Sequence, residues 1–158
     1  MTRAERTRIE DGGVLDLQDV MRVMTNSFDP NFGEAWTAPQ CAGLLPMPGV
    51  WLCLARDGER PVGFALARLI GKEAELLLLA VSRDAQGGGL GRSLLAGFER
   101  GARERGATGL HLEVRDGNHA VELYTRTGFV AVGRRKDYYR GSKGLVYDAL
   151  TLAKASGR

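Results

Sequence analysis

The stretch EAELLLLAV-SRDA-QGGGLG-RSLLAGFERGARER, residues 73–105, contains a short apolar run, a glycine-rich loop and an amphipathic segment. The run from Glu73 to Val81 lies between a turn and the glycine loop, and it is short for a helix, which favours a buried strand. From Leu90 to Arg105 apolar residues recur at helical spacing with Arg and Glu opposite them, and Gly106 is well placed to end that helix. A helix of this length predicts a crossover between parallel strands.

The flanking segments extend this pattern into one mixed α/β domain. Toward the N-terminus the sequence predicts strands at Thr7 to Glu10, Val50 to Arg56 and Pro61 to Ile70, a helix at Leu15 to Phe28 capped by Asp16, and a shorter helix at Thr37 to Leu45. Toward the C-terminus it predicts strands at Leu110 to Val114, Phe129 to about Tyr138 and Val146 to Leu152, and a helix at Asn118 to Thr127. We therefore expect a single domain over residues 1–158, with a sheet of about six to seven strands flanked by about four helices and with about 152–158 as a loose tail.

Size, composition and charge exclude several classes of protein. The 158 residues are 44% hydrophobic, which is enough for a core without disulfides or metal. Lys and Arg number 22 against 19 Asp and Glu, a net charge of +3, and no run of like charges resembles a nucleic-acid-binding tail. Cys41 and Cys53 lack metal-type spacing, which predicts free buried thiols and a reducing compartment. With neither a signal peptide nor a membrane-length apolar run evident, we expect a cytoplasmic monomer or dimer that binds no metal, nucleic acid or membrane.

The glycine loop predicts a site for phosphate groups. Backbone amides at the start of the helix from Leu90 point toward an anion, and the four glycines within residues 87–91 let it approach closely. The letters fit neither the Rossmann spacing, with glycine at the first, third and sixth positions, nor the P-loop, with its Gly-Lys-Ser/Thr triplet. A basic cluster elsewhere leaves two interpretations open, a solvated loop or a surface that attracts an acidic partner or a phosphate-rich cofactor; it consists of Arg134, Arg135, Lys136 and Arg140.

Two motifs carry a resemblance to a known family. Gln86-Gly87-Gly88-Gly89-Leu90-Gly91 is similar to the Gln/Arg-x-x-Gly-x-Gly/Ala signature of GNAT-type N-acetyltransferases, and residues 118–129 resemble their Asn…Leu-Tyr-x-x-x-Gly-Phe segment. The resemblance implies acetyl-CoA as cosubstrate, with its pantetheine arm in a gap between splayed parallel strands. The cofactor-binding residues that it implies are Leu79, Ala80, Val81, Gln86, Gly87, Gly88, Gly89, Leu90, Gly91, Arg92 and Asn118. Asn118 is explained equally well as a helix N-cap.

Acetyl transfer to an amine needs a base for the amine proton and an acid for the departing thiolate. No Ser/His/Asp or Cys/His set is evident, so we expect direct attack by the amine. Glu113 lies on the polar face of a predicted strand; it serves as the base if that strand borders the cleft, and otherwise it is a solvent-facing or ion-paired glutamate. His111 and His119 are weaker candidates for the base. The resemblance implies Tyr124 as the general acid, with core packing as the alternative.

A closer resemblance concerns the acceptor. Leu112-Glu113-Val114-Arg115, followed by Arg134-Arg135-Lys136-Asp137-Tyr138-Tyr139, is similar to the ribosomal-protein-alanine N-acetyltransferases, in which such a glutamate is the base and Tyr-Tyr follows a basic stretch. Trp36 resembles the tryptophan of a Pro-Trp segment that borders the substrate groove in that group. The resemblance implies a peptide or protein N-terminus as acceptor, with Trp36, Tyr138 and Tyr139 as substrate-binding residues.

Two other functions stay open on the sequence. One is acetylation of a small amine such as a polyamine, an amino acid or an aminoglycoside, and the other is a non-catalytic acyl-CoA-binding module. We expect the opening between Phe28 and Trp51 to distinguish a groove from a closed pocket. Acidic lining residues would favour a polyamine, whereas Tyr138 or Tyr139 at the rim would favour a peptide.

Overall fold

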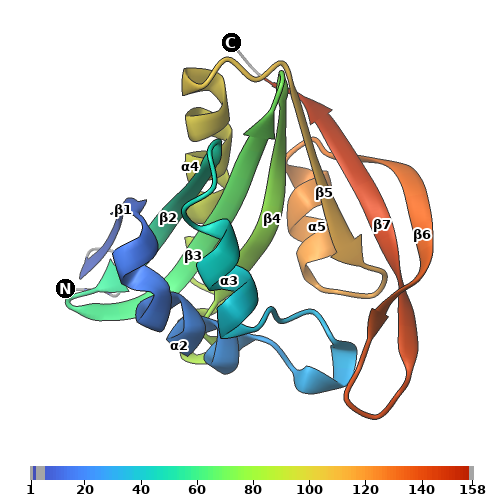
Figure 1. Ribbon diagram of the computed structural model, residues 1–158, viewed down its shortest axis with the longest axis horizontal. Coiled ribbons are helices and arrows are strands. Elements are labelled where there is room, and N and C mark those ends of the chain that lie inside the picture. The colour runs from blue at the N-terminus through green and yellow to red at the C-terminus, as the bar shows by residue number, and fades with distance from the viewer. Residues whose placement is uncertain (1, 3–5, 157–158) are drawn as a thin grey trace.

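The computed structural model describes residue 2 and residues 6–156, and a mixed sheet forms its centre (Figure 1). The seven strands of the described chain are β1 (Thr7–Gly12), β2 (Val50–Asp57), β3 (Arg60–Ile70), β4 (Glu73–Val81), β5 (Gly109–Arg115), β6 (Val130–Arg140) and β7 (Val146–Ala155). They lie in the order β1-β2-β3-β4-β5-β7-β6, and all neighbours are antiparallel except β4 and β5. The predicted mixed α/β fold, with one parallel pair, is confirmed.

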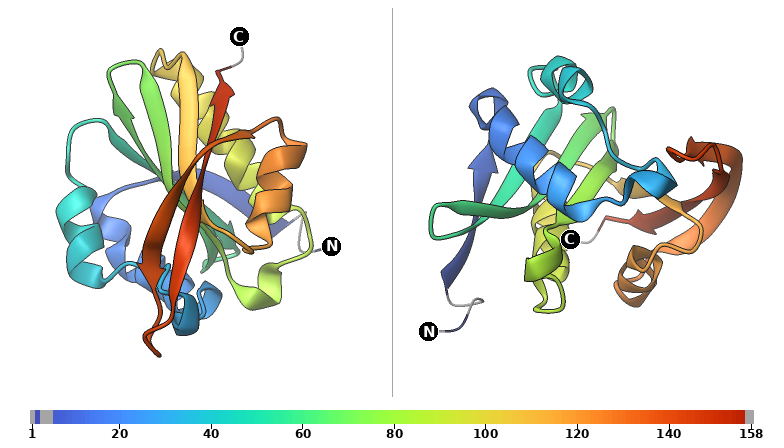
Figure 2. Two further views of the ribbon diagram at one scale, coloured as in Figure 1. Left: turned by 90° about the vertical axis from the view of Figure 1, so that its right-hand side faces the viewer. Right: turned by 90° about the horizontal axis from the view of Figure 1, so that it is seen from below.

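Helices cover both faces of the sheet (Figure 2). On one face lie α2 (Leu17–Ser27) and α3 (Ala38–Leu44), and on the other α4 (Leu90–Glu104) and α5 (Ala120–Arg126). Three short 3₁₀ helices lie in connecting segments of the described chain: η1 (Val14–Asp16), η2 (Pro30–Phe32) and η3 (Arg83–Ala85). β2 contributes to both layers because its side chains alternate, so that Cys53 packs on the α4 side and Leu54 on the α2 side. None of the helices in the described chain has the length and apolarity needed to span a membrane.

The structure differs from the prediction at the start of α2, where Asp16 holds the N-cap position without a side-chain cap, and at the end of β7. Asp16 does not cap α2 with its side chain; its carboxylate accepts a hydrogen bond from the Gly13 amide (2.8 Å) and pairs with Arg56 (3.3 Å), which ties η1 to β2. β7 continues to Ala155 because its pairing with β5 extends to the first residue of that strand, Gly109. Residues 152–155 therefore belong to the sheet rather than to a loose tail, and residues 157–158 lie outside the described chain.

The parallel strands β4 and β5 pair over only part of their length. Pairing ends at Leu76 and Leu112, and from there the two strands diverge (Figure 1). Leu77 is the extra residue of a β-bulge opposite β3, at the point of divergence. A bulge bends a strand and shifts its alternation, so Leu76 packs on the α4 side while Leu78 packs on the α2 side. The splay implied by the resemblance is therefore present, and within the described chain no strand pairs with residues 77–81 on the β5 side.

Candidate active site

A cleft of about 930 Å³ opens where β4 leaves β5. Most of the residues predicted to bind the cofactor line it: Leu79, Ala80, Val81, Gln86, Gly87, Gly89, Leu90, Gly91 and Asn118. Gly88 and Arg92 are not part of its wall, and the Arg92 side chain is exposed. The volume lies within the range of pockets that hold organic ligands, so the cleft has room for a large cofactor.

The glycine loop presents its backbone to this cleft. Gly87 and Gly89 have φ angles of 85° and 87°, in the left-handed region that favours glycine. An added Cβ would meet nothing within 4 Å at either position, so the backbone conformation, and not packing, requires glycine. Gly89 directly precedes α4, whose first amides have no acceptor within the helix and lie at the positive end of its dipole. Gln86 fixes the loop to the strand because its Nε2 donates a hydrogen bond to the Val81 carbonyl (2.9 Å).

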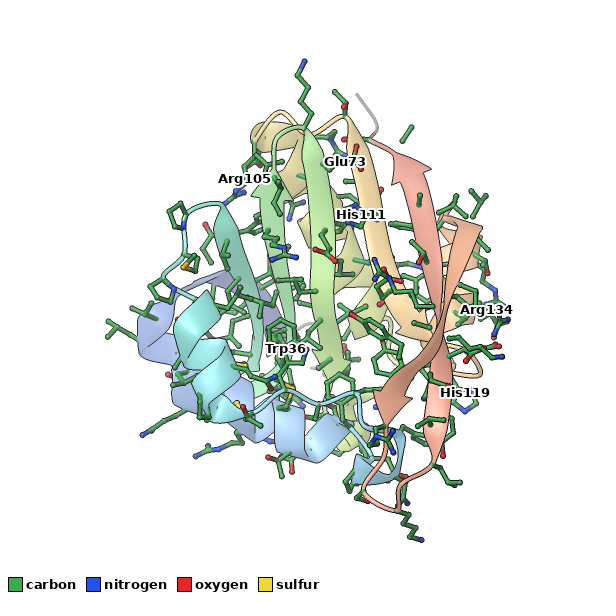
Figure 3. All side chains as sticks on the ribbon, turned by 45° about the vertical axis from the view of Figure 1, so that its right-hand side comes forward. Trp36, Glu73, Arg105, His111, His119 and Arg134 are labelled. Atoms are coloured by element: carbon green, nitrogen blue, oxygen red, sulfur yellow. The ribbon has the colours of Figure 1, made fainter. Side chains whose placement is uncertain are left out.

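A smaller pocket of about 110 Å³ adjoins the cleft, and the two share five wall residues: Phe28, Glu34, Leu79, Asn118 and Ala120. It brings together all the residues predicted to act in catalysis or to bind the acceptor: Glu113, Tyr124, Trp36, Tyr138 and Tyr139. Trp36 comes from the side of the sheet that α2 and α3 cover (Figure 3). The two tyrosines come from β6, where their rings meet edge to face at 4.9 Å. We call this space the acceptor pocket.

The border of the acceptor pocket differs in part from the prediction. Phe28 lines it, but Trp51 does not, because Trp51 stacks on Phe98 at 6.0 Å in the core between the sheet and α4. Both features that were expected to separate polyamine from peptide acceptors are present. The wall contains Tyr138 and Tyr139, and it also contains three acidic side chains, those of Glu34, Glu75 and Glu113. No Lys or Arg is among the described residues that form it.

Glu113 is held by one partner on each oxygen. Arg135 Nε donates to its Oε1 (2.8 Å), and Thr151 Oγ1 donates to its Oε2 (2.6 Å). The side chain is only 12% exposed. Each carboxylate oxygen keeps a further lone pair. Glu113 is therefore ion-paired and also borders the pocket, and its role as the base stays a prediction.

Tyr124 is buried between the core and the acceptor pocket. Its ring meets Phe129 edge to face at 5.9 Å, and it also lines the pocket. Burial raises the pKa of Tyr124, and the nearby Tyr139 phenol and Glu34 carboxylate raise it further. A phenol with a raised pKa keeps its proton through the neutral range. Tyr124 is thus a core residue that also presents a protonated hydroxyl group at this pocket.

Glu34 and Arg115 belong to the site although the sequence did not point to them. Asn118 Nδ2 donates a hydrogen bond to Glu34 Oε2 (2.6 Å), and Arg115 Nε lies 3.3 Å from Glu34 Oε1. The Arg115 guanidinium also lies over the ring of Phe32 at 3.7 Å. Asn118 Oδ1 accepts from the amide of Ala120, the first residue of α5 (2.8 Å), although the N-cap position itself is His119 and not Asn118 as predicted. The contact of Asn118 with a cofactor stays a prediction.

The two histidines do not lie in the acceptor pocket. His111 Nδ1 lies 3.5 Å from Glu73 Oε1, in the paired part of β4 and β5 and away from Trp36 (Figure 3). His119 lines the larger cleft instead. Within the described chain no group of three or more His, Cys, Asp or Glu side chains is placed to hold a metal ion. The two cysteines are free and buried.

The fold defines a class of α/β protein in which a glycine loop precedes a helix and a cleft opens beside the free main chain of a splayed strand. Residues 17–129 match the family model described as Acetyltransferase (GNAT) family. The chain belongs to this family, as the glycine loop and the segment 118–129 predicted.

Individual relatives agree with the closer resemblance. Over 97 residues the chain is 37% identical to the ribosomal protein bS18-alanine N-acetyltransferase of Haemophilus influenzae, a match that covers 61% of this chain and 66% of that protein. Over 111 residues it is 38% identical to the N-alpha-acetyltransferase RimI of Mycobacterium tuberculosis, with 65% of each covered. The crystal structure of the ribosomal-protein-S18-alanine N-acetyltransferase from Escherichia coli is similar with a TM-score of 0.84 at 26% identity, covering 96% of this chain and 95% of that one.

Proposed function

We propose that this chain transfers an acetyl group from acetyl-CoA to the N-terminal α-amine of a protein, in particular to the N-terminal alanine of a ribosomal protein. The observation that carries the proposal is the junction of the two cavities where β4 leaves β5, with Glu113 and Tyr124 on the acceptor side. The names of the similar proteins support the same class of acceptor.

The residues of the larger cleft fit acetyl-CoA. The amides at the start of α4 suit pyrophosphate oxygens, because they point out of the helix without internal acceptors. The main chain of residues 77–81 offers N–H and C=O groups without a strand partner to the amides of a pantetheine arm. Arg83 on the cleft wall adds a positive charge. Bound in this way, acetyl-CoA supplies the activated thioester carbonyl.

Glu113 and Tyr124 divide the proton transfers in this proposal. Glu113, directly or through a water, takes a proton from the acceptor ammonium. The neutral nitrogen then forms a bond to the acetyl carbon as the carbon–sulfur bond breaks, and the excess proton on the new amide nitrogen passes through water to Tyr124 once Tyr124 has protonated the sulfur. Tyr124 donates its proton to the departing sulfur, which suits a phenol that burial keeps protonated.

A small amine such as a polyamine is the second candidate, because three glutamates line the acceptor pocket. Each of these carboxylates already has an arginine within 3.3 Å, which reduces the negative charge available to a polycation. Tyr138 and Tyr139 also offer ring surface to an extended peptide chain. We therefore place the peptide first.

Incubation with acetyl-CoA and a peptide library of varied N-termini, beside spermidine, free amino acids and an aminoglycoside, tests the proposal by mass spectrometry. We expect acetyl on the α-amines of peptides. Transfer to small amines alone would contradict a protein acceptor. No transfer to any amine, with acetyl-CoA binding intact in calorimetry, would instead identify a non-catalytic acyl-CoA-binding module.

A further inference from the structure

Glu34 lies where the two cavities meet. It belongs to the segment between η2 and α3, it lines both cavities, and its side chain is only 10% exposed. The other wall residues that the cavities share there are apolar or neutral: Phe28, Leu79, Asn118 and Ala120. A carboxylate with so little access to water is poorly hydrated, and a cation that reaches it is attracted strongly.

The three carboxylates of the acceptor pocket differ in how well their charge is satisfied. Arg68 Nε donates to Glu75 at 2.9 Å, and Arg135 Nε donates to Glu113 at 2.8 Å. Arg115 Nε lies 3.3 Å from Glu34 but makes no hydrogen bond within the described structure. Glu34 accepts its short hydrogen bond from a neutral amide, that of Asn118. Arg115 thus satisfies Glu34 less completely than Arg68 and Arg135 satisfy their carboxylates, so Glu34 has the largest remaining capacity of the three to bind a further cation.

Glu34 also lies close to the groups that would act on the thioester. Burial is the main cause of the raised pKa of Tyr124 and of Tyr139, and the negative charge of Glu34 raises the pKa of both phenols further. An ammonium ion bound to Glu34 would therefore lie beside the proposed acid, at the end of the cleft proposed for the cofactor. In the proposed reaction, the acceptor amine binds at this position before it attacks the thioester.

The segment that carries Glu34 is fixed to the β6–β7 hairpin. The Ser142 amide donates to the Pro30 carbonyl (3.0 Å), and the rings of Phe32 and Tyr147 meet edge to face at 5.4 Å. A side chain at Gly141 would collide with the carbonyl oxygen of Asn31, so the two backbones lie in close contact. These contacts hold the carboxylate in place before any ligand arrives, which lowers the entropic cost of binding.

We infer that Glu34 is a substrate-binding residue that receives the ammonium group of the acceptor, an inference that rests on the acetyl transfer proposed above. Glu113 is then left to accept the proton, and Glu34 to select and place the charged amine. The ligand class that this site takes is a chain with a free N-terminal ammonium group.

Two hexapeptides that differ in one group test this role without turnover. One begins with alanine and the other with lactic acid, which replaces the ammonium by a hydroxyl of similar size. With CoA present and no acetyl donor, fluorescence of Trp36 in the acceptor pocket, checked by calorimetry, reports the binding of each. We expect the wild type to bind the alanine peptide about tenfold or more tightly than the lactyl peptide, since hydrogen bonds to charged groups are the strong ones.

The variants give the decisive comparison. Glu34→Gln should reduce the preference to about threefold or less, because the isosteric amide keeps the shape and loses the charge. Glu34→Asp, which keeps the charge, should retain part of the preference, and it serves as the second variant if Glu34→Gln folds poorly. Glu59→Gln, an identical exchange on the exposed turn between β2 and β3, should leave it unchanged.

Three results would overturn the inference. These are a wild type that does not prefer the ammonium, a preference that survives Glu34→Gln in folded protein, or a preference that disappears in Glu113→Gln and not in Glu34→Gln. The proposed function fails in a different assay, through absence of acetyl transfer to peptides, so the two failures can be told apart.

Discussion

Tyr124 and Glu113 reach the acceptor pocket in opposite electrostatic settings. Tyr124 is buried among apolar rings and close to the negative charge of Glu34, so its neutral form is favoured. Glu113 is surrounded by donors, the guanidinium of Arg135 and the hydroxyl of Thr151, so a full negative charge is accommodated there. A buried phenol and a carboxylate held by hydrogen-bond donors therefore lie in one small pocket.

Tyr124→Phe should slow turnover and leave binding nearly intact. The ring keeps its edge-to-face contact with Phe129, and only the hydroxyl proton is lost. General acid catalysis contributes about 10²–10⁴-fold, so we expect kcat to fall by about 10²-fold. Steady-state kinetics give kcat, and calorimetry with CoA gives the affinity, which should stay within about twofold. A kcat within threefold of the wild type would leave Tyr124 with a packing role alone.

Glu113→Gln should lower kcat far more than it lowers the affinity for acetyl-CoA. The amide can still accept from Thr151, but it cannot take a proton. Thr151→Ala is the matched control, since it removes one hydrogen bond and leaves the carboxylate. We expect about 10²-fold or more for Glu113→Gln and less than tenfold for Thr151→Ala, both from kcat measured at saturating acetyl-CoA. Unchanged turnover in Glu113→Gln would remove it as the base.

The sequence predicted the residues that belong to local motifs and missed those joined only by the fold. Glu113 and Tyr124 lie in recognisable segments, one in a strand and the other in a helix. Glu34 meets its partner Asn118 across 84 residues of sequence, and no spacing rule connects them. Trp51 does not border the opening as expected, because strand alternation turns its side chain toward α4.

At the scale of elements, the glycine loop lines the larger cleft, and the bulge in β4 lies where β4 leaves β5 and that cleft opens. The glycine loop could be predicted from the sequence, because four glycines directly before a helix are typical of a site that binds phosphate groups. The bulge could not be predicted, because residues 76–79 are all leucine and a shift in the alternation of side chains does not change the pattern of residue types there. The divergence of β4 from β5 was available only through the resemblance.

Gly89→Ala should weaken cofactor binding more than it weakens the fold. Alanine at a φ of 87° costs about 1–2 kcal/mol, and relief of that strain would turn the loop amides away from the cleft. Gly58→Ala is the matched control, because Gly58 has a φ of 62°, open space around it and a place in the turn between β2 and β3. Both variants should lose similar stability in thermal unfolding. Only Gly89→Ala should lose about tenfold or more in affinity for CoA by calorimetry, and equal losses in the two variants would count against the loop as the phosphate site.

At the scale of the whole molecule, the sheet separates two apolar cores and opens at one end to admit the ligands. The core on the α4 side extends through α5 to Tyr124, and the core on the α2 side extends to Phe28 and Trp36. The Tyr124 phenol and Trp36 are therefore anchored in different cores, and they line one pocket because β4 and β5 diverge between them. Because the phenols of Tyr124 and Tyr139 are shielded from water, the free energy of unfolding depends on their ionisation.

The free energy of unfolding should fall at alkaline pH, in part through Tyr124. Burial raises the pKa of Tyr124 and Tyr139, so the folded protein keeps their protons while the unfolded chain releases them above about pH 10. Their contribution is fully present below that pH and decreases above it, by up to about 1.4 kcal/mol per pH unit for each phenol. Burial raises the pKa of Cys41 and Cys53 in the same direction, so the decline begins near pH 9. Urea unfolding followed by circular dichroism between pH 8 and pH 11.5 measures the slope in the wild type and in Tyr124→Phe. The variant should lose stability less steeply above pH 10, and parallel slopes would mean that Tyr124 ionises as easily in the folded protein as in the unfolded chain.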